Sequence, residues 1–166
     1  MLSWRSEIEK QIAEDGKRCP CIRCREVKTN KWSGEYQVVV RKYHSAEGIE
    51  YFISAESFDG DTMYGFVRLR IPSSKFNDVF EELWFCSLVR ELHVQGVVQT
   101  TVKSGSNHVQ HRGIGKKLMS VAERISKENG FYKMSVISGI GVQGYYEKLG
   151  FTLHPGEGKF MIKDLV

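Results

Sequence analysis

The chain begins with a helix-forming pattern and then becomes rich in β-branched residues. Ser3 can cap a helix over residues 3–15, in which Ile8 and Ile12 share one face. Residues 17–34 show no periodicity, which predicts a loop or a metal-binding knuckle. Beyond them, runs of valine and aromatic residues predict strands over 36–43, 50–54, 63–71 and 83–94, the last mostly apolar as in a buried central strand.

The apolar pattern changes to helical spacing after Gly113. One stripe of apolar residues follows, formed by Ile114, Leu118, Val121, Ala122 and Ile125. A short strand over 134–137, a short helix over 142–149 and a closing hairpin over 151–153 and 159–164 complete the chain. This order of helix, antiparallel strands, helix, strand, helix and strands predicts a mixed α/β or α+β fold.

Composition narrows the class of protein. The chain has 166 residues, of which 41% are hydrophobic and 27% charged, as expected for one compact domain. These values exclude a largely disordered chain, a collagen-like repeat and a coiled-coil rod. No apolar run approaches the roughly 20 residues that span a bilayer, and the first residues lack a signal-peptide core. We therefore expect a soluble, cytoplasmic protein without a membrane segment.

The net charge of +4 is unevenly distributed. Residues 1–31 carry eight Lys/Arg against five Asp/Glu, and residues 108–133 carry six against two, whereas residues 32–107 are acidic overall. A basic block attracts phosphate, either on a nucleotide cofactor or on nucleic acid. A solvated helix face has the same composition, so both interpretations stay open.

Three cysteines, Cys19, Cys21 and Cys24, lie within six residues. In a chain without an export signal, clustered thiols are more typical of metal ligands than of disulfides. A structural zinc needs four ligands, so these three thiolates require one more. The alternative is three free cysteines. Candidates for the fourth ligand are His44, His93, Cys86, which is otherwise a small buried hydrophobic residue, or a group outside this chain.

Residues 110–117 place two glycines, Gly113 and Gly115, between a predicted strand and a predicted helix. Glycines at this spacing let the backbone turn tightly and approach a ligand. The unpaired N–H groups of the first helical turn then favour phosphate. The segment matches neither the P-loop nor the dinucleotide fingerprint, and a plain helix start is the alternative.

Two tyrosines, Tyr145 and Tyr146, precede a Gly-Phe pair at residues 150–151. A phenol with a pKa of about 10 is protonated at neutral pH and can donate a proton to a leaving group. The alternative is that both rings pack on the sheet, as most tyrosines do.

Taken together, these two segments resemble the GCN5-related N-acetyltransferase (GNAT) family. Residues 110–115 match its Gln/Arg-x-x-Gly-x-Gly/Ala loop, and residues 146–151 match its Tyr-x-x-x-Gly-Phe stretch. The resemblance implies the GNAT acetyltransferase fold, a mixed central sheet with flanking helices. An N-terminal helix and a Cys-rich zinc loop would precede it here. The short turn expected between the first two strands departs from the family, which places helices there, and predicts an open acceptor side.

The resemblance also implies a role for particular residues. Tyr146 faces the thioester sulfur of acetyl-CoA, with Tyr145 as the alternative catalytic residue or its partner. Two residues at the end of the long strand have alternative roles. Glu91 acts as a general base or pairs with a basic neighbour, and we favour the pairing. For the side chain of His93 we favour a core histidine. The residues expected to bind acetyl-CoA are Glu91, Leu92, His93, Val94, Gln110, His111, Arg112, Gly113, Ile114, Gly115, Lys116 and Tyr146.

Three further segments narrow the resemblance to the catalytic subunit family of Elongator: residues 19–27, 88–94 and 136–142. That family joins a radical S-adenosylmethionine domain to an acetyltransferase-like domain, and modifies the wobble uridine of tRNA with acetyl-CoA. The radical domain needs a Cys-x-x-x-Cys-x-x-Cys motif, whereas this chain has Cys-x-Cys-x-x-Cys. We therefore expect neither an iron–sulfur cluster nor S-adenosylmethionine in this chain, which is part of a larger protein or a stand-alone relative.

The sequence thus predicts an N-terminal helix and Cys-containing linker over 1–34 and an acetyltransferase domain over 35–166. The expected partners are tRNA, with the basic residues around the cysteines contacting phosphates, and a radical domain or partner chain. The expected activity is cleavage of the acetyl-CoA thioester in response to tRNA. The alternatives are a histone-type lysine N-acetyltransferase and a non-catalytic module that binds CoA and RNA.

Overall fold

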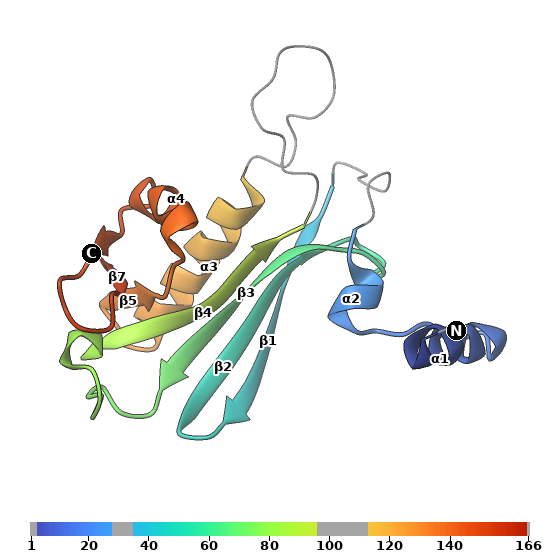
Figure 1. Cartoon of the computed structure of the whole chain (residues 1–166), viewed down its shortest axis with the longest axis horizontal. Coiled ribbons are helices and arrows are strands. Elements are labelled where there is room, and N and C mark those ends of the chain that lie inside the picture. The colour runs from blue at the N-terminus through green and yellow to red at the C-terminus, as the bar shows by residue number, and fades with distance from the viewer. Residues whose placement is uncertain (1–2, 28–34, 96–112, 166) are drawn as a thin grey trace, which may run out of the picture.

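The computed structural model describes residues 3–27, 35–95 and 113–165, and these form one mixed sheet with helices beside it (Figure 1). In this part of the chain the sheet has seven strands in the order β1-β2-β3-β4-β5-β7-β6. The strands are β1 Gln37–Ser45, β2 Gly48–Glu56, β3 Met63–Pro72, β4 Cys86–Val94, β5 Lys133–Val136, β6 Thr152–Leu153 and β7 Met161–Asp164. The helices are α1 Trp4–Glu14, α2 Ile22–Arg25, α3 Ile114–Glu128 and α4 Gln143–Glu147, with 3-10 turns η1 Glu81–Leu83 and η3 Ile140–Val142.

Strands β1 to β4 form an antiparallel meander. The turn from β1 to β2 is tight, with Glu47 at a positive φ of 54°. No helix stands between these two strands, as the sequence predicts. The open acceptor side that we expect from this short turn stays a prediction.

Strand β4 pairs in parallel with β5, and α3 forms part of the crossover that such a pair requires. The pairing runs only from Cys86 and Lys133 to Val89 and Val136. At that point β4 contains an extra residue, Arg90, which shifts its register against β3. Since a bulge bends and twists a strand, it accounts for the separation of β4 from β5 beyond Val89. The second half of β4 is therefore paired on one edge only among the described strands.

Helix α3 covers one face of the sheet, and the core lies between them (Figure 1). Four members of the predicted apolar stripe are buried, and Val121 is partly buried against the same core. The buried α3 residues pack against Ile53, Val67 and Leu69 of the meander. The other face of the meander carries polar and aromatic side chains, among them Arg41 and Phe52.

The N-terminal helix is confirmed, with Ser3 accepting a hydrogen bond from the backbone N–H of Ser6. No α1 residue is buried by the part of the chain that the structure describes, and Trp4 is 84% exposed. Figure 1 shows α1 projecting away from the sheet. The predicted loop over 17–34 contains a short helix, α2. This helix is only one turn long, so it leaves no periodic pattern in the sequence.

The predicted mixed sheet with flanking helices is confirmed, and so is the closing hairpin of β6 and β7. The strand predicted over 83–94 was extended too far toward the N-terminus, because Glu81–Leu83 forms a 3-10 turn. Only its first half is buried, since the second half lacks a β5 neighbour. Within the described residues, no helix is long and apolar enough to cross a membrane.

Candidate active site

The N-terminus of α3 presents unpaired backbone N–H groups. Gly113 precedes the helix with a positive φ of 132°, a conformation that favours glycine. The first hydrogen bond of the helix runs from the N–H of Lys117 to the carbonyl of Gly113 at 2.7 Å. The N–H groups of Ile114, Gly115 and Lys116 therefore have no acceptor within the helix. The side chain of Ile114 is buried in the core, so that only its backbone can face a ligand.

Three elements converge at Gly115. A Cβ atom added there would lie 2.5 Å from the hydroxyl oxygen of Tyr145 and 3.3 Å from a methyl carbon of Val94. Only a residue without a side chain lets the end of β4, the start of α3 and helix α4 approach in this way. The structure thus brings together Val94, Gly115 and Tyr145, three residues that the sequence analysis assigns to one site.

The two tyrosines occupy different environments. Tyr146 is buried, with its ring centroid 5.3 Å from that of Tyr145 and 5.8 Å from that of Phe151. Tyr145 is 39% exposed, and its hydroxyl lies beside Gly115. Burial raises the pKa of Tyr145, and burial together with Tyr145 raises the pKa of Tyr146. Both phenols therefore hold their protons at neutral pH, as a proton donor must.

Among the described strands, the second half of β4 has no partner on the edge that faces away from β3. Glu91 lies 3.8 Å from Arg68, which confirms its pairing with a basic neighbour. His93 is not a core histidine: its side chain is half exposed and lies 3.9 Å from Glu26. It pairs with Phe66 on the face of the sheet opposite α3, whereas its neighbour Leu92 packs against the core. At the end of the strand Gln95 is buried, and its side-chain oxygen has no hydrogen-bond partner among the described residues.

Part of the predicted phosphate loop cannot be placed. Gln110, His111 and Arg112 lie outside the described residues. Their expected contacts with pyrophosphate stay predictions, as do the roles of the residues that the structure does describe.

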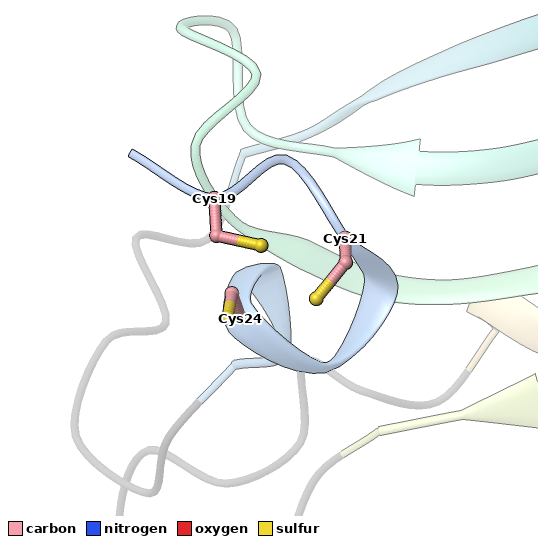
Figure 2. A group of neighbouring side chains, drawn as sticks. All are labelled: Cys19, Cys21 and Cys24. Atoms are coloured by element: carbon pink, nitrogen blue, oxygen red, sulfur yellow. The ribbon is translucent and has the colours of Figure 1, made fainter. Parts of the chain in front are cut away.

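The thiols of Cys19, Cys21 and Cys24 gather at the N-terminus of α2 (Figure 2), with all three sulfur atoms within 4.8 Å of one another. The backbone N–H of Cys24, the two neighbouring thiols and Arg5 lower the pKa of Cys21 to about 6. The hydrogen bond between the thiols of Cys24 and Cys21, together with burial, raises the pKa of Cys24 to about 12. The cluster therefore favours a thiolate at Cys21, and the thiolate is the form of cysteine that binds metals.

None of the three fourth-ligand candidates in this chain joins the cluster among the described residues. Cys86 is buried at the start of β4, where burial raises its pKa to about 11, so it is the small buried hydrophobic residue that was the alternative. His93 faces Glu26, and His44 lies on β1. The sequence analysis missed Arg5, whose guanidinium lies 3.2 Å from the sulfur of Cys24.

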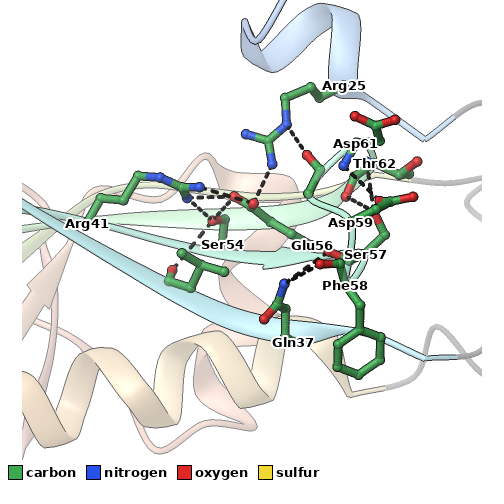
Figure 3. A network of polar contacts seen from close by, with 12 residues as sticks. Arg25, Gln37, Arg41, Ser54, Glu56, Ser57, Phe58, Asp59, Asp61 and Thr62 are labelled. Carbon is green, nitrogen blue, oxygen red and sulfur yellow. Dashed lines mark hydrogen bonds and ion pairs between the residues drawn. The ribbon is translucent and has the colours of Figure 1, made fainter.

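A buried carboxylate connects the Cys-containing segment to the sheet (Figure 3). Glu56 on β2 is 1% exposed and accepts hydrogen bonds from Arg41 at 2.6 Å, from Ser54, and from Arg25 of α2. Arg25 also donates to the carbonyl of Gly60 at 2.8 Å. No periodic pattern signals this network, because its members are distant in the sequence.

A cavity of about 610 Å³ lies between α2 and the face of the sheet that α3 leaves uncovered. It combines cationic and aromatic side chains. Its lining residues are Pro20, Cys21, Ile22, Arg23, Arg25, Arg41, Tyr43, Phe52 and Met63.

Comparison with known proteins decides the family. Residues 22–151, most of the chain, match the Acetyltransferase (GNAT) family. The chain belongs to the GNAT acetyltransferase family. The sheet, its α3 crossover and the Gly115 convergence are thus parts of a GNAT acetyltransferase domain.

This GNAT domain has relatives that act in tRNA modification or in Elongator. It is 34% identical to the tRNA uridine(34) acetyltransferase of Dehalococcoides mccartyi, covering 98% of this chain and 36% of the relative. It is 39% identical to Elongator complex protein 3 of Homo sapiens, covering 87% of this chain and 28% of the relative. The chain therefore spans about a third of the length of these relatives and is homologous to one part of them.

Solved structures agree with this assignment. The GNAT domain superposes on the archaeal Elp3 of Methanocaldococcus infernus with a TM-score of 0.74 and 35% identity, covering 96% of this chain and 38% of that one. A putative acyl-CoA N-acyltransferase from Klebsiella pneumoniae matches with a TM-score of 0.53 at 12% identity, a likeness in fold alone. The predicted GNAT fold and the predicted relation to the Elongator family are confirmed.

Proposed function

We propose that this chain binds acetyl-CoA and cleaves its thioester in response to tRNA, as the acetyltransferase part of wobble-uridine modification. The observation that carries the proposal is the convergence of α3, β4 and α4 at Gly115. The relatives named as tRNA uridine(34) acetyltransferases support the choice of substrate.

The backbone supplies the proposed contacts with the carrier molecule. The free N–H groups at the start of α3, with the positive charge of Lys116, receive the pyrophosphate. The edge of β4 over residues 91–94 offers N–H and C=O groups to the amides of the pantetheine arm. The arm would then lie along β4 in the position of an added strand. The unpartnered oxygen of Gln95 lies at the end of that edge and can accept a further hydrogen bond.

The tyrosines divide the remaining work. As water attacks the acetyl carbon and the carbon–sulfur bond breaks, Tyr146, deeper in the site, donates its phenolic proton to the departing sulfur. The products are acetate and the free CoA thiol, and the proton released by the water restores the phenol. Tyr145, whose hydroxyl lies beside Gly115, contacts the phosphate end instead. Glu91 is engaged with Arg68, which argues against a role as the general base of a lysine acetyltransferase.

Release of free CoA thiol from acetyl-CoA, measured with and without tRNA, tests this proposal. We expect tRNA to raise the rate, and Tyr146→Phe to lower it by about 100-fold, the usual effect of losing a general acid. Acetyl-CoA affinity should be nearly unchanged in that variant. Tyr145→Phe is the matched comparison, and it should weaken acetyl-CoA binding more than it slows turnover.

Other outcomes identify other functions. Tight acetyl-CoA binding without thiol release under either condition would indicate a non-catalytic module that binds CoA and RNA. Transfer of acetyl groups to histone lysines, unaffected by tRNA, would indicate a protein acetyltransferase. A reversed pattern in the two tyrosine variants would exchange their roles.

The cysteine cluster fits a structural zinc. Three thiols already lie close enough to share one ion, and Arg5 is placed to offset the charge of the thiolates. Bound zinc would hold the segment before β1 in place and supply no step of the reaction. Cys19, Cys21 and Cys24 would be its ligands.

The cavity beside α2 suits a contact with tRNA. Arg23, Arg25 and Arg41 line it, and the carboxylate of Glu56 pairs with two of them, Arg25 and Arg41. Tyr43 and Phe52 add aromatic surface for stacking with bases. The proposal assigns tRNA phosphates to this cavity. The proposed function also includes a radical S-adenosylmethionine domain as partner, on the same or another chain. The proposed location of the protein is the cytoplasm.

Replacing Arg23, an exposed residue of this cavity, tests the tRNA surface. In Arg23→Gln we expect weaker tRNA binding, with the slope of log affinity against log salt reduced by about one unit per lost phosphate contact. Arg124→Gln is the control, since Arg124 is an exposed arginine on α3, paired with Glu128. Equal tRNA affinity and salt slope in both variants would place the RNA elsewhere.

A further inference from the structure

The connection between β3 and β4, residues 73–85, carries an uncovered apolar surface. Four of its large apolar side chains are between 37% and 77% exposed in the part of the chain that the structure describes: Phe76, Val79, Trp84 and Phe85. We call these four residues the aromatic patch. We propose that the aromatic patch is a docking surface for another protein, whose binding segment carries apolar anchor residues among lysines and arginines.

The rings of the aromatic patch form one assembled surface. The ring centroid of Phe76 lies 5.4 Å from that of Trp84 and 5.3 Å from that of Phe85, and both contacts are edge-to-face. The indole N–H of Trp84 donates to the carbonyl of Asn77 at 3.0 Å, which fixes the orientation of this ring. Single exposed apolar residues are common on protein surfaces, whereas a contiguous group of them marks an interaction site.

The backbone at Phe85 points in the same direction. Phe85 has a φ of 63°, a left-handed conformation that bulky residues rarely adopt. Its N–H donates to the carbonyl of Lys75 at 2.6 Å and closes the connection. Glycine would adopt this conformation without strain, so the backbone does not account for a phenylalanine here. The exposed ring accounts for it if it contacts a partner, since aromatic side chains are the usual anchors of protein interfaces.

The charges beside the aromatic patch indicate the chemistry of the partner. Residues 73–85 carry three Asp/Glu against one Lys. Glu82 accepts a hydrogen bond from the N–H of Gly158, and Lys75 lies over the ring of Phe131. Asp78 and Glu81 are exposed and form no salt bridge with a described residue.

These two free carboxylates select between classes of partner. A lysine or arginine of the partner would pair with Asp78 or Glu81 and could also lie on an aromatic face of the patch. The same carboxylates repel the phosphates of RNA and of anionic lipids. A basic and apolar protein segment is therefore the occupant that fits both the rings and the charges.

A second copy of this chain is a poor match through its exposed helix. Helix α1 leaves Trp4 and Ile8 exposed, but it carries three Glu against one Arg and one Lys. Its net charge has the same sign as that of residues 73–85, which disfavours contact between them. We therefore assign the patch to a different protein.

The aromatic patch lies at the opposite end of β4 from the candidate active site (Figure 1). Strand β4 begins at Cys86, directly after the patch, and ends at Val94, beside Gly115. A bound partner would thus leave the start of α3 free. The inference does not depend on the proposed function.

Binding of a fluorescently labelled amphipathic peptide of leucine and lysine to the full chain tests this surface. We expect the unaltered chain to bind this peptide and not its counterpart with glutamate in place of lysine. Phe76→Ala should weaken binding at least about tenfold. Phe58→Ala is the matched control, because Phe58 is 67% exposed and lies outside the patch. It should bind as the unaltered chain does.

The contribution of charge is tested in the same assay. The double variant Asp78→Asn, Glu81→Gln should bind the leucine–lysine peptide more weakly, and its affinity should depend less on salt, since two exposed attractive charges are lost. Glu7→Gln on α1 should change neither quantity. Equal salt dependence in the double variant and in Glu7→Gln would contradict a basic partner.

Phe85→Gly separates binding from a role in the fold. This variant removes the exposed ring and relieves the backbone, so we expect weaker peptide binding with an unchanged or raised Tm. A lowered Tm with unchanged peptide affinity would show that the rings serve the fold and would overturn the proposal. The absence of peptide binding to the unaltered chain, or equal affinities in Phe76→Ala and Phe58→Ala, would do the same.

Two further measurements exclude the other occupants. Sedimentation velocity of the unaltered chain should show no association that Phe76→Ala abolishes, because such an association would make a second copy the occupant. Binding of single-stranded RNA should likewise be equal in the unaltered chain and in Phe76→Ala. A loss of RNA affinity in that variant would make RNA the occupant and overturn the assignment of a protein partner.

Discussion

Gly115→Ala is expected to abolish most acetyl-CoA binding while leaving the protein folded. The added Cβ would lie 2.5 Å from the hydroxyl oxygen of Tyr145, a contact too short to persist. The tyrosine side chain can swing away, so the core is spared, but its hydroxyl then moves into the space in front of the α3 N–H groups. Loss of one hydrogen bond to a charged phosphate costs about 1.5–3 kcal/mol, which corresponds to roughly 10- to 150-fold in affinity.

Isothermal titration with acetyl-CoA measures this effect, and Gly144→Ala is the matched control. Gly144 precedes Tyr145 on α4, and a Cβ added there would meet nothing closer than a carboxylate oxygen of Glu147 at 3.9 Å. The control should keep its affinity. An unchanged affinity in Gly115→Ala would mean that the phosphates bind away from the start of α3.

Glu56→Gln is expected to lower the free energy of unfolding substantially. Its carboxylate is buried and holds Arg25, whose side chain is only 13% exposed, together with the half-exposed Arg41. Removing one partner of a buried ion pair costs about 3–5 kcal/mol, and we expect about 3 kcal/mol here because Arg41 retains contact with water. Urea unfolding measures the difference. Glu128→Gln, which breaks an exposed pair on α3, should cost under about 0.5 kcal/mol.

The same network makes stability depend on pH. Burial acts to raise the pKa of Glu56, but hydrogen bonds from Arg41, Ser54 and Arg25 outweigh it and lower the pKa overall. The carboxylate therefore contributes its stabilisation fully above the ordinary glutamate pKa of about 4.3, and loses it as the pH falls through the lowered value. The difference between the unaltered chain and Glu56→Gln should shrink in that acidic range. A difference that is constant down to pH 2 would contradict this account.

Local sequence was sufficient for features that depend on neighbouring residues. Ser3 and the spacing of Ile8 and Ile12 located α1, and the stripe that begins at Ile114 located α3. The glycine at position 113 indicated the helix start, and the structure shows the positive φ that this position requires. Whether an apolar face has anything to pack against is a separate question, so the pattern located α1 but did not show that Trp4 and Ile8 stay exposed.

Contacts between distant residues could not be predicted in this way. The extra residue at Arg90 moves the core-facing positions of β4 from Ser87 and Val89 to Leu92 and Val94, and the bulge becomes visible only when β3 is placed beside the strand. The approach of Tyr145 to Gly115 joins segments separated by a helix and a strand. The contact of Glu9 with Cys24 likewise spans 15 residues, without periodicity to suggest it.

The parallel pairing of β4 with β5 also has a consequence for how the chain folds. Strands β1 to β4 follow one another and pair with their sequence neighbours, so this part can form from short-range hairpins. Strand β5 reaches β4 only after the chain has passed through α3, and closing such a long loop is the slower event. We therefore expect the meander to form before α3 and α4 reach the end of β4. A growing chain would complete its proposed acetyl-CoA site last, so bound ligand would stabilise only the final stage of assembly.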